Sequence, residues 1–164
     1  MNMEKKTYVI TLSRVFPAKH SKAGEPTKFR DAFNAGQVFN RGSECLYVRP
    51  KLHTIRANYP LWEKRIKEVQ EGNAVLSVRQ WTGKPYRSKQ VEIARLTAAN
   101  GVGIQMLRFL GDNFNGGYIR NGVYPSDKIL AKNDGLSLAD WEAWFRGYDV
   151  SKSLAIIHFT KFRY

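Results

Sequence analysis

The chain of 164 residues is strongly basic, with 27 lysines and arginines against 14 acidic residues and a formal net charge of +13. Its length suits one domain with a substantial core, and a hydrophobic content of 43% excludes a chain that is disordered throughout. The single cysteine, Cys45, excludes an internal disulfide and a cysteine-rich metal site, which fits a reduced, cytoplasmic setting. No apolar run is long enough to predict a transmembrane helix, and residues 1–6 lack the apolar core of a signal peptide.

The excess of positive charge indicates a polyanionic partner. Lysine and arginine release counterions from a nucleic-acid backbone when they bind it, and they steer it from a distance. An anionic membrane would attract the same charge, but no basic amphipathic helix accompanies it here. We therefore expect a nucleic acid and no membrane as the partner, with a basic surface that serves only solubility as the alternative.

The first part of the chain predicts a strand, a loop and a helix. Residues 7–16 alternate apolar and polar side chains, which is typical of a half-buried strand. Residues 17–26 are polar and rich in turn formers, so we expect a loop. Thr27 can cap a short helix that carries Phe29 and ends at Gly36.

The next segment places a primary amine, a hydroxyl and a guanidinium within six residues. It reads Lys-Leu-His-Thr-Ile-Arg over residues 51–56. In a straight strand, Lys51 and Thr54 would face opposite sides. If Lys51 instead lies on the turn that leads into the strand, the polar tips of Lys51, Thr54 and Arg56 can converge.

The middle of the chain predicts a helix followed by three strands. Pro60 suits the first turn of a helix, and Gly72 is its expected end. The apolar stripe of this helix consists of Trp62, Ile66 and Val69. The strands are expected over residues 74–81, 87–96 and 102–109.

Basic and aromatic side chains interleave on the predicted hairpin between the first two of these strands. They are Arg79, Trp81, Lys84, Tyr86, Arg87 and Lys89. Cations can meet phosphates while aromatic faces stack on unpaired bases, so this pattern predicts nucleic-acid binding. The alternative is a solvated hairpin with Trp81 tucked into the core.

The last part of the chain predicts short elements. We expect a loop over residues 112–117 and a short hairpin over residues 118–124. Ser126 and Ser137 can each cap a helix. A final strand is expected over residues 154–162.

These elements predict an α+β fold around a largely antiparallel sheet. Five to seven strands and two to four helices follow one another without regular βαβ alternation. Neither an internal repeat nor an interdomain linker is apparent, so residues 1–164 are expected to form a single domain.

The residues Lys51, Thr54, Ile55 and Arg56 resemble the K-x-x-T-I-R signature of the ASCH family, which belongs to the PUA-like superfamily. This resemblance implies a small, mostly antiparallel PUA-like β-barrel flanked by helices, with the signature lining a cleft. It also implies function, because some members of the family bind RNA and one bacterial branch hydrolyses the amide of acetylated cytidine.

The resemblance further implies a set of catalytic residues. In the cytidine-deacetylating relatives, the lysine and threonine of the signature act with an acidic residue just before the last helix, which gives Lys51, Thr54 and Asp134 here. A lysine of lowered pKa can take the threonine proton, and a carboxyl group can protonate the leaving amine. Those relatives carry Glu where this chain has Asp134, which is one methylene shorter. The alternative is that Thr54 and Arg56 bind an anion and Asp134 forms a turn.

Two functions are therefore expected, of which the first is favoured. The first is an ASCH-type, PUA-like domain that binds RNA or single-stranded nucleic acid, with a base or modified nucleoside in a cleft formed by Lys51, Thr54, Arg56 and Asp134. The second is an amidohydrolase acting on an acetylated cytidine nucleoside. A protein-interaction module is a third interpretation, which a large exposed apolar patch would favour. The three histidines lack metal-ligand spacing and no phosphate-binding glycine motif occurs, so neither a metal nor an organic cofactor is expected.

Overall fold

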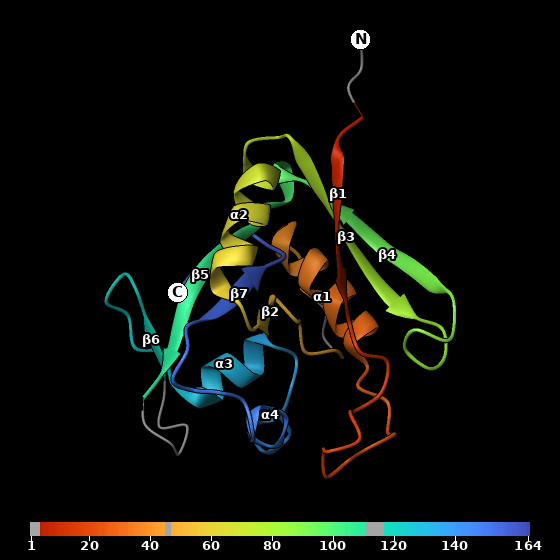
Figure 1. The fold of residues 1–164 in the computed structure, drawn as a ribbon, viewed down its shortest axis with the longest axis vertical. Coiled ribbons are helices and arrows are strands. Elements are labelled where there is room, and N and C mark those ends of the chain that lie inside the picture. Colours follow the sequence, from red (N-terminus) through yellow and green to blue (C-terminus); the bar gives the residue numbers. More distant parts are fainter. Residues whose placement is uncertain (1–3, 45–46, 111–116) are drawn as a thin grey trace.

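The computed structural model describes residues 4–44, 47–110 and 117–164, which form two sheets and four α-helices (Figure 1). The first sheet has the order β1-β3-β4 and consists of β1 (Lys6–Thr11), β3 (Ala74–Trp81) and β4 (Gln90–Leu96). The second has the order β2-β7-β5-β6 and consists of β2 (His53–Arg56), β7 (Leu154–His158), β5 (Gly103–Phe109) and β6 (Gly117–Ile119). β1 and β3 are parallel and the other neighbouring pairs are antiparallel. The predicted α+β class with mostly antiparallel sheets is thus confirmed.

Helices connect the two sheets and cover one end of the second. α1 (Phe29–Asn40) lies between the sheets in Figure 1, and α2 (Tyr59–Gln70) contacts β3, β5 and β7. α3 (Asp127–Asn133) and α4 (Leu138–Phe145) follow one another near the same end of the second sheet, and a short 3₁₀ turn (Ala98–Asn100) precedes β5. None of the described helices is long and apolar enough to cross a membrane.

The two sheets do not join into a closed barrel within the described ranges. In those ranges, no strand of the β1-β3-β4 sheet pairs with a strand of the β2-β7-β5-β6 sheet. The sheets are held together by a common core instead of by backbone hydrogen bonds around a ring.

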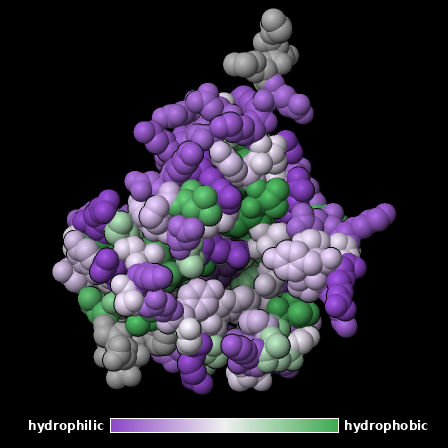
Figure 2. All heavy atoms as spheres, in the orientation of Figure 1, coloured by the Kyte–Doolittle hydropathy of each residue, from purple (hydrophilic) through white to green (hydrophobic). Residues whose placement is uncertain are grey.

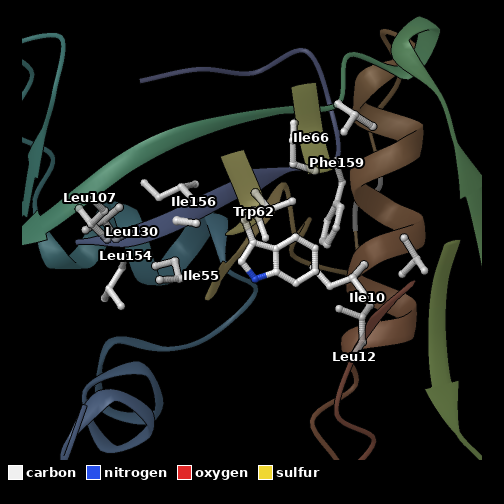
Figure 3. Packing of buried hydrophobic residues seen from close by; sticks show 14 of the residues in the cluster. Ile10, Leu12, Ile55, Trp62, Ile66, Leu107, Leu130, Leu154, Ile156 and Phe159 are labelled. Atoms are coloured by element: carbon white, nitrogen blue, oxygen red, sulfur yellow. The ribbon is translucent and has the colours of Figure 1, made fainter. Parts of the chain in front are cut away.

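Aromatic and aliphatic side chains from both sheets meet around α2. Figure 3 shows the indole of Trp62 between Ile55 on one side and Ile10 and Phe159 on the other. Ile66 is completely buried, as the predicted apolar stripe requires. The prediction that Trp62 belongs to the core is confirmed.

The helix expected to end at Gly36 continues to Asn40, so that prediction was wrong. A Cβ atom on Gly36 would lie 3.1 Å from the carbonyl carbon of Lys51, and closer still to its oxygen. This glycine therefore lets another backbone segment approach the helix and does not terminate it. At the other end, the predicted cap at Thr27 was wrong: Lys28, at a φ of +60°, is the residue before the first helical turn and provides no side-chain cap, while Thr27 Oγ1 accepts a hydrogen bond from the Phe29 amide one position earlier in the chain.

Several strands are shorter than the sequence pattern suggests. β1 ends at Thr11, β4 begins at Gln90 and β7 ends at His158. Side chains and turns compete with the sheet at these ends: Ser88 Oγ, for example, donates to the Lys84 carbonyl just before β4. The expected hairpin over residues 118–124 has only β6 as a strand, and most of the expected loop over 112–117 lies outside the described residues.

Candidate functional site

Backbone hydrogen bonds fix the segment that leads into β2. The Lys51 amide donates to the Ala32 carbonyl of α1 at 2.8 Å, and the Leu52 amide donates to the Asn133 carbonyl of α3 at 2.7 Å. Lys51 lies just before the first residue of β2, on a segment that α1 and α3 hold from two sides. Its side chain therefore does not follow the strict alternation of the strand that carries Thr54 and Arg56.

Two glycines make room for Lys51. Because Gly36 of α1 has no side chain, the main chain of Lys51 can approach the helix closely, as described above. Gly135 has a φ of +78°, and a Cβ atom there would lie 3.1 Å from Lys51 Cβ. The resulting seat leaves the lysine only 1% exposed.

The buried ammonium group of Lys51 is paired with Asp134. Nζ lies 2.6 Å from Asp134 Oδ1 and donates a second hydrogen bond to the main-chain oxygen of Asp134 at 2.7 Å. It also lies 4.2 Å from the ring centre of Phe29, on the α1 side. Residues separated by more than eighty positions thus form one compact charged group.

Burial opposes the charges of this pair. It lowers the pKa of Lys51, while Asp134 acts in the opposite direction and Arg56 adds to the lowering. Burial likewise raises the pKa of Asp134, against the influence of Lys51, Arg56 and Trp141. Hydrogen bonding in the pair offsets the loss of hydration of both groups.

A second polar group lies near Asp134. The hydroxyl of Tyr164 accepts a hydrogen bond from Asn133 Nδ2 at 3.0 Å and shares a second hydrogen bond with His53 Nε2 at 2.6 Å. His53 Nδ1 lies 3.9 Å from Asp134 Oδ1 and is buried without a hydrogen-bond partner among the described residues. Burial lowers the pKa of His53 well below its ordinary value, with His158 and Lys51 adding to the effect, so the ring is neutral.

Thr54 and Arg56 complete an inner pocket next to the lysine–aspartate pair. Its walls are Leu12, Ser13, Phe29, Lys51, Thr54, Ile55, Arg56, Asp134, Leu136, Trp144, Phe145 and Tyr148, and we call this space the inner pocket. Its cavity of about 30 Å³ is large enough for roughly two water molecules. No hydrogen bond joins Lys51 to Thr54 in the described part of the chain, so Lys51 does not contact the threonine hydroxyl as its base.

A wider hollow of about 510 Å³, which we call the outer basin, adjoins the inner pocket. Ser13, Arg56, Trp144 and Tyr148 line both spaces and form the wall between them. Figure 2 shows a small hydrophilic area near the centre of the face seen in Figure 1, bordered by hydrophobic and pale side chains. The basin residues outside the signature were not singled out by the sequence, because they come from the loop after β1 and from the end of α4.

The β3–β4 hairpin forms a separate aromatic groove. The rings of Trp81 and Tyr86 lie 5.2 Å apart, with Tyr86 89% exposed and held at a φ of +63°. Trp81 is half-buried and lines a groove of about 440 Å³, so it is not tucked into the core. This groove shares Ser13 and two neighbouring loop residues with the outer basin.

The cations predicted on the hairpin have two different environments. Lys84, Arg87 and Lys89 are exposed near the groove. Arg79 donates instead to Ser77 Oγ at 2.9 Å, within a polar network on the face of the first sheet. The structure therefore brings Lys51, Thr54, Arg56 and Asp134 together around one pocket and places the hairpin residues at a distance from it.

No family model, curated protein or solved structure matches this chain. Within the described ranges, no cluster of three or more His, Cys, Asp or Glu side chains could hold a metal ion. Functional inference therefore rests on the geometry of the inner pocket, the outer basin and the aromatic groove.

Proposed function

We propose that this chain is an ASCH-type, PUA-like domain that binds RNA or another single-stranded nucleic acid and takes part of one base or modified nucleoside into the inner pocket. The observation that carries this proposal is the convergence of Lys51, Thr54, Arg56 and Asp134 on one pocket of a strongly basic chain. Under this proposal, the two sheets are the two halves of the family's barrel.

The polar groups of the inner pocket suit the edge of a base. They offer a hydroxyl, an ammonium group, a guanidinium group and a carboxyl group, which together can donate to and accept from a Watson–Crick edge. The pocket is far smaller than the roughly 300 Å³ that whole small-molecule ligands need. We therefore expect an edge or a small substituent to enter, while the rest of the nucleotide stays in the outer basin.

The aromatic groove supports contact with a neighbouring nucleotide. Tyr86 is exposed beside the half-buried Trp81, and exposed cations lie on the same hairpin. Base–aromatic stacking contributes about 1–3 kcal/mol per base. A strand that crosses the loop between the basin and the groove would contact both sites.

Binding of labelled single-stranded RNA, followed by fluorescence anisotropy at two salt concentrations, tests this proposal. Tyr86→Ala should weaken binding about tenfold, because it removes one stacking face. Tyr124→Ala is a matched control, since Tyr124 and Tyr118 form a ring pair with the same 5.2 Å separation on the β6 side of the molecule. Equal affinity of the wild type and Tyr86→Ala would argue against nucleic-acid binding at this groove.

One observation favours a second function, the hydrolysis of an acylated cytidine nucleoside. A lysine whose pKa is lowered by burial lies 2.6 Å from a carboxyl group, and Thr54 lines the same pocket. In that reaction neutral Lys51 would take the Thr54 proton as the threonine oxygen attacks the amide carbon, and the C–N bond would break as Lys51 gives this proton to the leaving amine. Water would then hydrolyse the acyl-threonine ester, which releases acetate and restores Thr54. Purified protein should then release acetate from acetylcytidine, and Thr54→Val should abolish the release. Retained turnover in Thr54→Val would exclude threonine as the nucleophile.

A further inference from the structure

The outer basin concentrates positive charge without acidic residues. Its lining includes Lys19, Arg56 and Arg146 and no carboxylate. Neither Lys19 nor Arg146 has an ion pair or side-chain hydrogen bond among the described residues. Lys19 and Arg146 therefore add charge that no anion of the described residues neutralises, which is an electrostatic match for an anionic ligand.

Asp140, whose main-chain oxygen contacts the basin residue His20, has its carboxylate engaged elsewhere. The Asp140 carboxylate pairs with Lys22 at 2.9 Å, in a neighbouring hollow. His20 lines the basin, but its Nδ1 accepts from the Lys22 amide and its Nε2 donates to the Asp140 main-chain oxygen. Both ring nitrogens of this histidine are therefore engaged by main-chain groups, and the lysine and the two arginines are the cations of the basin.

Arg56 links the basin to the inner pocket. One end of its guanidinium group donates to the Thr11 carbonyl, while Nε is buried and has no partner in the described part of the chain. A buried donor without a partner is unfavourable, and an anion at the wall between the two spaces would satisfy it. An anion bound there would also lie next to whatever enters the inner pocket.

The shape of the basin suits a nucleotide. Gly147 has a φ of +100°, and the turn that it makes places Arg146 and Tyr148 on the same hollow. Trp144 packs edge-on against Phe16, which fixes its ring beside Arg56 in the shared wall. A cavity of about 510 Å³ lies within the size range of small-molecule sites.

We infer that the outer basin is a phosphate-binding subsite, so that the ligand of the inner pocket is a nucleotide, free or within a strand, in preference to an uncharged nucleoside. This inference rests on the proposed function, because it assumes that a base or its substituent occupies the inner pocket. The phosphate lies against Arg56, Lys19 and Arg146, with the sugar passing Trp144 and Tyr148.

The test compares each of the four ribonucleosides with its 5′-monophosphate by isothermal titration of the full chain. At least one monophosphate should bind about tenfold more tightly than its nucleoside, which one additional charge-assisted contact provides. Lys19→Ala and Arg146→Ala should bring this ratio close to one. Lys152→Ala is the control, because that lysine is exposed and does not line the basin.

The outcomes separate the subsite from the proposed function. Equal affinity for nucleoside and monophosphate would overturn the subsite and leave nucleoside binding in the pocket intact. If neither binds, while inorganic phosphate binds and Arg146→Ala abolishes that binding, the subsite stands as an anion site and the proposed function fails. If inorganic phosphate also fails to bind, both are overturned.

Discussion

Replacing Gly36 with alanine should destabilise the protein, although alanine is the better helix former. A Cβ atom at this position would lie within 3.1 Å of the Lys51 carbonyl carbon, a distance at which the neighbour must already give way. The distance from this Cβ atom to the Lys51 carbonyl oxygen would be shorter still, and real Cβ atoms essentially never come so close to another atom. Both partners are backbone, and the Lys51 amide is bonded to Ala32 of the same helix, so neither can move freely.

The expected magnitude is the difference between two opposing effects. Alanine in place of glycine within a helix contributes about 1 kcal/mol of stability. Forcing extra volume into a closely packed site costs about 1–3 kcal/mol, and the upper part of that range applies where backbone meets backbone. The free energy of unfolding of Gly36→Ala should therefore fall by about 1–2 kcal/mol. Ligand affinity should fall as well, because the displaced segment carries Lys51.

Urea unfolding at equilibrium measures this change. Arg30→Ala is the control, because that side chain is exposed on the same helix and its loss should change the free energy of unfolding by no more than about 0.5 kcal/mol. An increase of about 1 kcal/mol in the free energy of unfolding of Gly36→Ala is what helix propensity alone gives. That result would refute the claim that Gly36 makes room for the main chain of Lys51.

Three further changes test the polar interior. Lys51→Met should lower the free energy of unfolding by about 3–5 kcal/mol because it leaves Asp134 buried without its partner, and adding Asp134→Leu should restore much of the loss in the same urea assay. Burial holds the pKa of His158 at about 3, so its contribution is complete above pH 6.5 and is lost as the pH falls from 6.5 toward 3. Unfolding curves measured between neutral and acid pH should show that the stability of His158→Gln falls less steeply with decreasing pH than that of the wild type, by up to about 1.4 kcal/mol per pH unit. Tyr164→Phe should lower stability by about 1–3 kcal/mol at pH 7, because His53 and Asn133 then lose a partner, and an unchanged midpoint would contradict the assigned hydrogen bonds.

Local patterns predicted individual elements well where one physical cause dominates. The strand over residues 74–81 was predicted with its observed bounds, because an apolar run lies between two turns. The helix that begins at Tyr59 was predicted from its proline and its stripe of Trp62, Ile66 and Val69, all of which are buried. Strand ends were less predictable, because side chains such as Ser88 compete there with the sheet for backbone partners.

Features that depend on distant parts of the chain were not predictable. A glycine that ends a helix and a glycine that admits another backbone look alike in sequence, and Gly36 is the second kind. The signature residues and Asp134 were singled out from the sequence. The hydrogen bond between His53 and Tyr164 was not predicted, because these two residues lie 111 positions apart. Lys19 and Arg146 gave no local signal either, since each is an ordinary surface cation until the fold brings them to one basin.

The binding of single-stranded RNA to Arg56→Gln tests the central claim most directly, because Arg56 lines both the inner pocket and the outer basin. The measurement is an anisotropy titration at two salt concentrations, with the fold of each variant verified by urea unfolding. Arg41→Gln, at the far end of α1, is the control. The account predicts that Arg56→Gln binds about tenfold more weakly and with a shallower salt dependence, while Arg41→Gln binds like the wild type. Unchanged affinity and salt dependence in a folded Arg56→Gln variant would contradict the claim that this pocket and basin bind nucleic acid.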